Sequence, residues 1–157
     1  MTTLRVTETK NIRRPIDVVR AHYSDIRHHF EHNVHPALPL EILAEDDRTF
    51  TYKQRSKVFG RTFLDIYVLE ARTDGTVYLK VIEGPTLGTE QIISFRALGD
   101  AETEVSVQLW TPLNGLNVLM APFVRRFISG ALKTVLEEDR VDMEVNGYQP
   151  RAAKKVA

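Results

Sequence analysis

The C-terminal stretch from Leu116 to Val145 is the long segment of this 157-residue chain that has an α-helical pattern. Asn114 and Asn117 are suitable N-terminal caps, Pro122 fits a first turn or a kink, and Gly147 offers a C-terminal stop. The pattern predicts a helix of roughly 25 residues. The apolar positions at helical spacing are Leu116, Met120, Phe123, Phe127, Ala131, Val135 and Val145.

Between residues 40 and 113 the apolar residues recur with a period of two instead, which predicts β-strands. Acidic or glycine-containing turns separate six such runs, and residues 4–13 add a seventh strand. An antiparallel sheet with one apolar face needs a cover, and we expect the C-terminal helix to provide it. The expected inward residues include Leu40, Ile42, Phe50, Tyr52, Leu64, Ile66, Val77, Leu79, Val81, Ile93, Phe95, Val105, Val107 and Leu109.

A second helical segment follows the first strand. Pro15 suits a first helical position, and the pattern ends before Pro36. This segment predicts one or two short helices, with an apolar stripe of Ile16, Val19, Tyr23, Ile26, Phe30 and Val34.

Composition limits the class of protein. A chain of 157 residues with 43% hydrophobic residues supports one domain, which we place at residues 1–147, followed by a flexible basic tail at 148–157. Its 21 basic and 21 acidic residues balance, so no net charge favours nucleic acid or an anionic membrane. The absence of cysteine excludes disulfides and cysteine-ligated clusters. Without a signal segment or a transmembrane run, we expect a cytoplasmic protein.

The order of strand, helix pair, six antiparallel strands and long C-terminal helix resembles the START-like and birch-pollen-allergen-like helix-grip (SRPBCC) superfamily, over residues 3–146. The resemblance implies an α+β fold in which a curved seven-stranded antiparallel sheet wraps around the C-terminal helix. It also implies an intervening cavity for a lipid, isoprenoid or aromatic polyketide; a filled core is the alternative. The expected ligand-binding residues are Tyr23, Tyr52, Leu64, Ile66, Leu79, Val81, Phe95, Val107, Leu109, Phe123, Phe127 and Ala131.

All five histidines lie between residues 22 and 35. On one helix, His28, His32 and His35 stand at i, i+4 and i+7, and Asp25 shares their face. Imidazoles one turn apart with a carboxylate suit zinc or ferrous iron. The spacing therefore indicates either a metal site or a solvated, pH-sensitive polar face.

A narrower resemblance concerns the metal. Asp25-Ile26-Arg27-His28 is similar to the first half of the D-x-x-H-x-x-x-x-H motif in the catalytic domains of Rieske-type ring-hydroxylating oxygenases. The acidic segment around Asp139 resembles their third ligand. This resemblance implies an Fe²⁺ site formed by His28, His32 and Asp139. The position five after His28 is Asn33, and no cysteine is present for a Rieske cluster, so a redox partner would have to supply electrons.

Helix geometry favours the solvated face over the metal site. At about 100° per residue, a straight helix over residues 16–35 would point Asp25, His28 and His32 away from its apolar stripe. Ligands could then reach the core only if the helix broke near Arg27.

Two hypotheses of function follow from the sequence. The favoured one is a module that binds or carries a hydrophobic small molecule, with no cofactor. The alternative is an enzyme that uses the same cavity, either an oxygenase-like iron catalyst or a cyclase or hydrolase with a histidine general base. Trp110 lies on the outer face of its predicted strand and suits a contact between subunits, so a homodimer is a further alternative.

Overall fold

A computed structural model describes residues 2–151 of the chain. Seven strands form one antiparallel sheet in the order β1-β7-β6-β5-β4-β3-β2. The first strand therefore pairs with the last, and the hairpins between them follow the chain order. The strands are β1 (Thr2–Ile12), β2 (Leu40–Glu45), β3 (Thr49–Val58), β4 (Arg61–Ala71), β5 (Val77–Glu83), β6 (Glu90–Gly99) and β7 (Glu102–Leu113).

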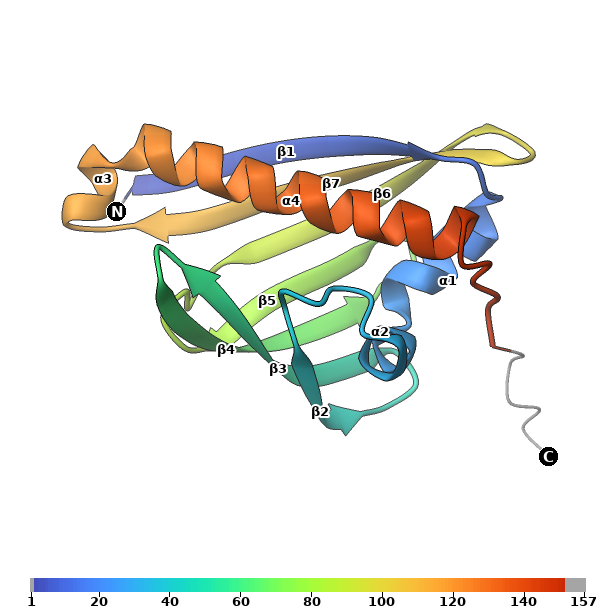
Figure 1. Ribbon diagram of the computed structural model, residues 1–157, viewed down its shortest axis with the longest axis horizontal. Coiled ribbons are helices and arrows are strands. Elements are labelled where there is room, and N and C mark those ends of the chain that lie inside the picture. The colour runs from blue at the N-terminus through green and yellow to red at the C-terminus, as the bar shows by residue number, and fades with distance from the viewer. Residues whose placement is uncertain (1, 152–157) are drawn as a thin grey trace.

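The expected C-terminal helix is present in two pieces. A short α3 (Leu116–Leu119) precedes the 24-residue α4 (Ala121–Glu144), whose first turn contains Pro122. Figure 1 shows α4 lying across the hollow side of the curved sheet, alongside β1. The predicted helix-grip architecture, with seven strands around a long helix and short helices after β1, is confirmed. No helix among residues 2–151 is long and apolar enough to cross a bilayer.

The core lies between the sheet and α4, and the expected inward parity is correct for most strands. Tyr52, Leu79, Val81, Val107 and Leu109 are buried, and Phe95 is partly buried against the core. The predicted inward face of β4 is wrong. Its buried residues are Asp65 and Leu69, with Tyr67 stacked on Tyr52, so Leu64 and Ile66 lie on the opposite face. The error arose because both faces of β4 carry apolar residues, so alternation alone could not choose between them.

The buried face of α4 also differs from the expected stripe. Leu132, Leu136 and Met143 are buried, and Val124 and Ile128 pack against the same core. Phe123, Phe127 and Ala131 lie on an exposed face. Two apolar stripes one residue apart both satisfy a helical period, and only the position of β1 decides which of them is covered.

The N-terminal helical segment breaks into two helices at Asp25. α1 (Ile16–Ser24) and α2 (Ile26–His32) meet at Asp25, whose backbone leaves the helical region (φ −93°, ψ 71°). The Asp25 side chain accepts a hydrogen bond from the His28 N–H at 3.0 Å, which caps α2. Because the helix is not straight, the expectation that its histidines form one solvated face is wrong.

The segment after α4 is more ordered than the expected tail. Tyr148 is buried, its hydroxyl donates to Asp25 Oδ2 at 3.0 Å, and Arg14 donates to its carbonyl at 2.8 Å. Arg151 donates to Glu31 at 2.8 Å. A flexible tail from residue 148 is therefore wrong for residues 148–151, and residues 152–157 lie outside the described part of the chain.

Candidate metal centre

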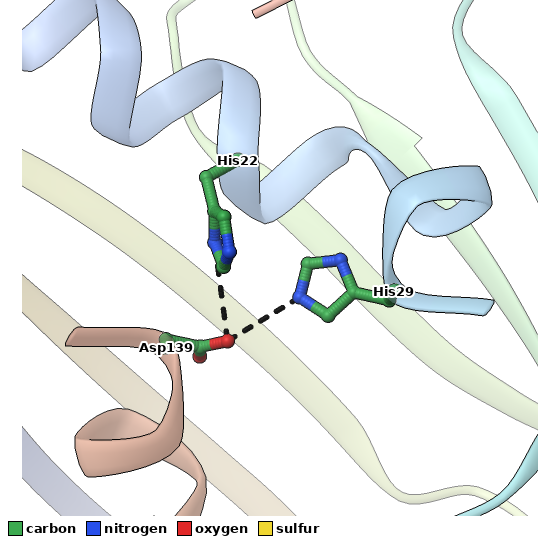
Figure 2. Close-up of side chains that lie close together, drawn as sticks. All are labelled: His22, His29 and Asp139. Atoms are coloured by element: carbon green, nitrogen blue, oxygen red, sulfur yellow. Dashed lines mark hydrogen bonds and ion pairs between the residues drawn. The ribbon is translucent and has the colours of Figure 1, made fainter. Parts of the chain in front are cut away.

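Four histidines and two aspartates from distant parts of the sequence meet at the C-terminal end of α4. His22 lies on α1, His28 and His29 lie on α2, and His35 follows α2. Asp139 and Asp142 lie on the face of α4 that turns toward these helices. Figure 2 shows His22 and His29 directed at the same oxygen of Asp139.

Asp139 is the centre of this cluster. Its side chain is 1% exposed, because it continues the buried stripe of Leu132 and Leu136 one turn later. Its Oδ1 atom lies 3.1 Å from His35 Nε2, 3.3 Å from His29 Nε2 and 3.9 Å from His22 Nδ1. A buried carboxylate needs positive charge or hydrogen-bond donors around it, and here imidazoles are what surround it.

Charge and burial act against each other on Asp139. Burial alone would raise the pKa of this carboxyl group. The charge of His35, with hydrogen bonds from His29 and His35, outweighs burial and holds the pKa far below its usual range. Asp139 is therefore ionised at neutral pH.

The tautomer of His22 is fixed by a second carboxylate. Asp142 Oδ2 lies 2.9 Å from His22 Nε2, so Nε2–H donates to Asp142 and the lone pair resides on Nδ1. The side chain is fully buried, and burial lowers its pKa to about 4 although Asp139 opposes the shift. His22 is therefore neutral at pH 7. Its Nδ1 atom makes no hydrogen bond to any described residue and faces Asp139.

His29 and His35 are oriented in the same way. His29 Nδ1 donates to the Asp25 carbonyl at 2.8 Å, and His35 Nδ1 donates to Glu138 Oε2 at 2.6 Å. The other ring nitrogen of each points at Asp139. Burial disfavours protonation of His35, but Asp139 and Glu138 raise its pKa to about 9, so it carries a charge at neutral pH. Such outer acceptors are what orient metal-binding imidazoles in proteins.

The spacing of His22, His29 and Asp139 fits a metal ion. Their ligand atoms lie within 4.8 Å of one another. Ligands about 2.0–2.2 Å from one ion are roughly 3–3.5 Å apart, close to the observed separations. A metal-free network would account for His35, as an imidazolium donor to Asp139. It does not give the His22 Nδ1 lone pair a donor, because the nearest Asp139 atom, 3.9 Å away, is a carboxylate oxygen; a cation bound by both atoms satisfies both.

Tyr23 brings a buried hydroxyl beside Asp139. Burial and the nearby charge of Asp139 raise its pKa well above the ordinary value. The hydroxyl therefore stays protonated and is a hydrogen-bond donor facing Asp139.

His22, His28 and Asp142 form an adjoining group whose ligand atoms also lie within 4.8 Å of one another. His28 Nε2 is 2.7 Å from Asp142 Oδ2. In this group Asp142 Oδ2 already accepts from the Nε2 atoms of both imidazoles, so these three ligand atoms are paired with one another. A pocket of about 450 Å³ lies beside it, with a lining that includes Asp25, Tyr148 and Arg151. His28 and Asp142 line this pocket, and Asp139 does not.

The structure does not bring together the expected metal set of His28, His32 and Asp139. Asp139 is central, but His28 bonds to Asp142 instead. His32 is exposed, its ring stacks on His28 at 4.2 Å, and its Nδ1 lies 3.2 Å from the His28 carbonyl. The prediction of His28 and His32 beside Asp139 assumed one helix face, and the break at Asp25 places His29 there instead.

His22 and His29 were missed, although a signal for them was present. Val19, His22, Ile26 and His29 follow one another at intervals of three, four and three residues. This spacing places the two histidines on the same face as buried apolar residues, which is unusual for His unless each has a partner. Asp139 between Leu136 and Met143 gives the same signal on α4.

The expected apolar cavity stays a prediction. The pocket beside His28 and another of about 600 Å³ near Lys10, Arg13 and Glu144 are lined mainly by polar residues, and neither lining includes an expected ligand-binding residue. Tyr23 lies 5.6 Å from Phe95 between ring centroids, so the inward aromatic residues contact one another there.

Comparison with known proteins supports the fold. No family model matches the chain, and no curated protein matches it in sequence. TTHA0849 from Thermus thermophilus has a TM-score of 0.82 at 15% identity, covering 92% of this chain and 100% of its own. The Zhui aromatase/cyclase from a Streptomyces species has a TM-score of 0.72 at 16% identity, covering 94% and 100%. A START superfamily protein from Mycobacterium smegmatis has a TM-score of 0.72 at 17% identity, covering 89% and 97%. At these identities the likeness concerns the helix-grip fold alone.

Proposed function

We propose that this chain is a metal-dependent enzyme that holds a divalent first-row transition metal, such as Fe²⁺ or Zn²⁺, on His22, His29 and Asp139. The observation that carries the proposal is the buried Nδ1 atom of His22, which is neutral, unpaired and directed at an ionised carboxylate. Two imidazoles and one carboxylate are a common ligand set for both metals and leave further positions for a small molecule.

The surrounding residues fit supporting roles. Asp142 and the Asp25 carbonyl fix the tautomers of His22 and His29, and His35 neutralises part of the charge on Asp139. A bound metal would supply Lewis acidity or oxygen chemistry. The Tyr23 hydroxyl can donate a proton or hydrogen bond beside Asp139. Because the chain contains no cysteine, a redox reaction here would take its electrons from a partner.

The test is metal binding by matched histidine variants. Full-length protein, made metal-free and titrated anaerobically with Fe²⁺ or with Zn²⁺, should bind one equivalent. His29→Ala should abolish that uptake, whereas His32→Ala should leave it intact, because His32 is exposed and does not reach Asp139. Elemental analysis of the purified protein provides an independent readout. If the wild type binds no metal, or if both variants lose it equally, the proposal is wrong.

A second candidate is uptake of a hydrophobic small molecule between the sheet and α4. Proteins of this fold include one named as an aromatase/cyclase, and Phe127 of α4 reaches Phe59 of the β3–β4 turn, with ring centroids 5.2 Å apart. Tyr23 and Phe95 would lie at the inner end of such a site, near Asp139. Native mass spectrometry of the purified protein, and a fluorescent apolar probe added to delipidated protein, test this candidate. Phe95→Asp should abolish uptake, and Leu98→Asp, at an exposed site on the same strand, should not.

A further inference from the structure

The end of the molecule opposite the metal centre gathers exposed apolar side chains. Because the sheet is antiparallel throughout, the β3–β4 turn, the β5–β6 loop and the β7–α3 connection all lie at one end. Figure 1 shows α3 and the β3–β4 turn at this end. We call the exposed residues here the apolar tip: Phe59, Leu87, Leu116, Leu119, Met120 and Phe123.

The helix α3 has no buried residue. Leu116 and Leu119 are each 78% exposed, and Phe123 on the following turn is 63% exposed. Gly115 directs α3 outward with a positive φ of 56°, a conformation that a residue with a side chain adopts at a cost. Single exposed apolar residues are ordinary, but a helix that is apolar and uncovered on every turn indicates a contact with something else.

The charge around the tip is positive although the whole chain is neutral. Residues 55–64 and 114–126 together carry five lysines and arginines and no acidic residue. Arg61 and Arg126, one from each segment, are exposed. The β5–β6 loop, residues 84–89, has no charged residue, and the strands on its two sides end and begin at Glu83 and Glu90. The overall neutrality of the chain therefore does not extend to this end.

We propose that the apolar tip docks the protein on an anionic lipid surface. Apolar side chains surrounded by Lys and Arg suit the interface of such a membrane, where the former insert and the latter meet lipid phosphates. A second copy of this chain is a poorer partner, because a two-fold contact would bring the same positive charges together. The proposal is independent of the metal centre.

Vesicle cosedimentation of the full-length protein tests this docking. The protein should bind vesicles of phosphatidylcholine mixed with phosphatidylglycerol, and added salt should weaken the binding. It should bind phosphatidylcholine alone much less. The double variant Leu116→Ser/Leu119→Ser should lower the partition constant about tenfold or more, because both apolar side chains are lost. Arg61→Gln/Arg126→Gln should lower it by roughly fivefold per charge.

Matched controls come from other surfaces of the protein. Val145→Ser changes an apolar residue that is 70% exposed at the other end of α4, and Arg48→Gln changes an exposed arginine elsewhere. Both should bind vesicles like the wild type. Absence of wild-type binding, or equal binding by the Leu116→Ser/Leu119→Ser variant, overturns the proposal. A dimer in analytical ultracentrifugation that this variant abolishes would assign the tip to a second copy and also overturn it.

Discussion

The two ends of α4 lie in opposite environments. At the C-terminal end, Asp139 is buried and surrounded by imidazoles, so a charged side chain lies inside the protein. At the N-terminal end, Phe123 is exposed beside Arg125 and Arg126, so apolar side chains lie outside. Each arrangement reverses the usual distribution of residues. At the buried end imidazoles surround the charge of Asp139, and at the exposed end no described residue covers the side chains of Leu116 and Leu119. We infer a metal for the first and a lipid surface for the second.

The largest effect expected at the buried end comes from the central carboxylate. Asp139→Asn keeps the shape of the side chain but removes its charge, so metal affinity should fall by roughly a hundredfold or more. Isothermal titration of the metal-free protein measures this change. Asp17→Asn, at an exposed position on α1, is the control and should bind metal normally. Unchanged affinity in Asp139→Asn would exclude Asp139 as a ligand.

The next largest effect is expected on the free energy of unfolding, in which substitutions at the two ends of α4 should differ. Leu136 is 1% exposed in the core, so Leu136→Ala should cost about 2–5 kcal/mol of unfolding free energy. Phe123→Ala removes a larger side chain from an exposed site and should change stability by less than about 0.5 kcal/mol. Urea denaturation of both variants provides the comparison. Similar losses in the two variants would mean that the tip packs within the protein in solution.

A smaller effect on the metal is expected from the residue that orients His22. In Asp142→Asn a neutral amide replaces the carboxylate that accepts from His22 Nε2–H, so the ring is oriented less firmly. Metal affinity should therefore fall by about 10–100-fold without loss of the site. Asn146→Ala is the control, because its contact with Asp142 is at the 3.5 Å limit of a hydrogen bond. Complete loss of the metal in Asp142→Asn would instead make Asp142 a direct ligand and favour the His22–His28–Asp142 group.

The pH dependence of stability should show both abnormal histidines in the metal-free protein. His22 has its folded pKa lowered to about 4, so its contribution is present above 6.5 and is lost as the pH falls. His35 has its folded pKa raised to about 9, so its contribution is present below 6.5 and is lost as the pH rises through 9. Stability should therefore be greatest near pH 6.5 and decline by on the order of 1–2 kcal/mol on each side.

Chemical denaturation across this pH range tests the sign of each contribution. His35→Gln should remove the decline on the alkaline side, whereas His32→Gln should leave the profile unchanged because His32 is exposed. A wild-type curve that rises steadily from pH 6.5 to 9 would contradict the raised pKa of His35.

The sequence by itself determined the order of elements and most of the core. The change in hydrophobic period at residue 40 gave the strands, and Leu116–Val145 gave the covering helix with its break near Pro122. These features are local, because the spacing of apolar residues within a strand or helix indicates which type of element it forms. Concentration of the histidines between residues 22 and 35, and the candidacy of Asp139, were also visible without coordinates.

Only the tertiary structure decided which faces and which histidines matter. β4 and α4 each offer two acceptable apolar faces, and the covered one depends on a neighbouring element. The group of His22, His29 and Asp139 depends on the break at Asp25, which turns His29 toward Asp139, 110 positions along the chain. A backbone bend of one residue leaves little trace in hydrophobic spacing, and contacts across such a separation leave none, so the ligand set could not be read from the pattern alone.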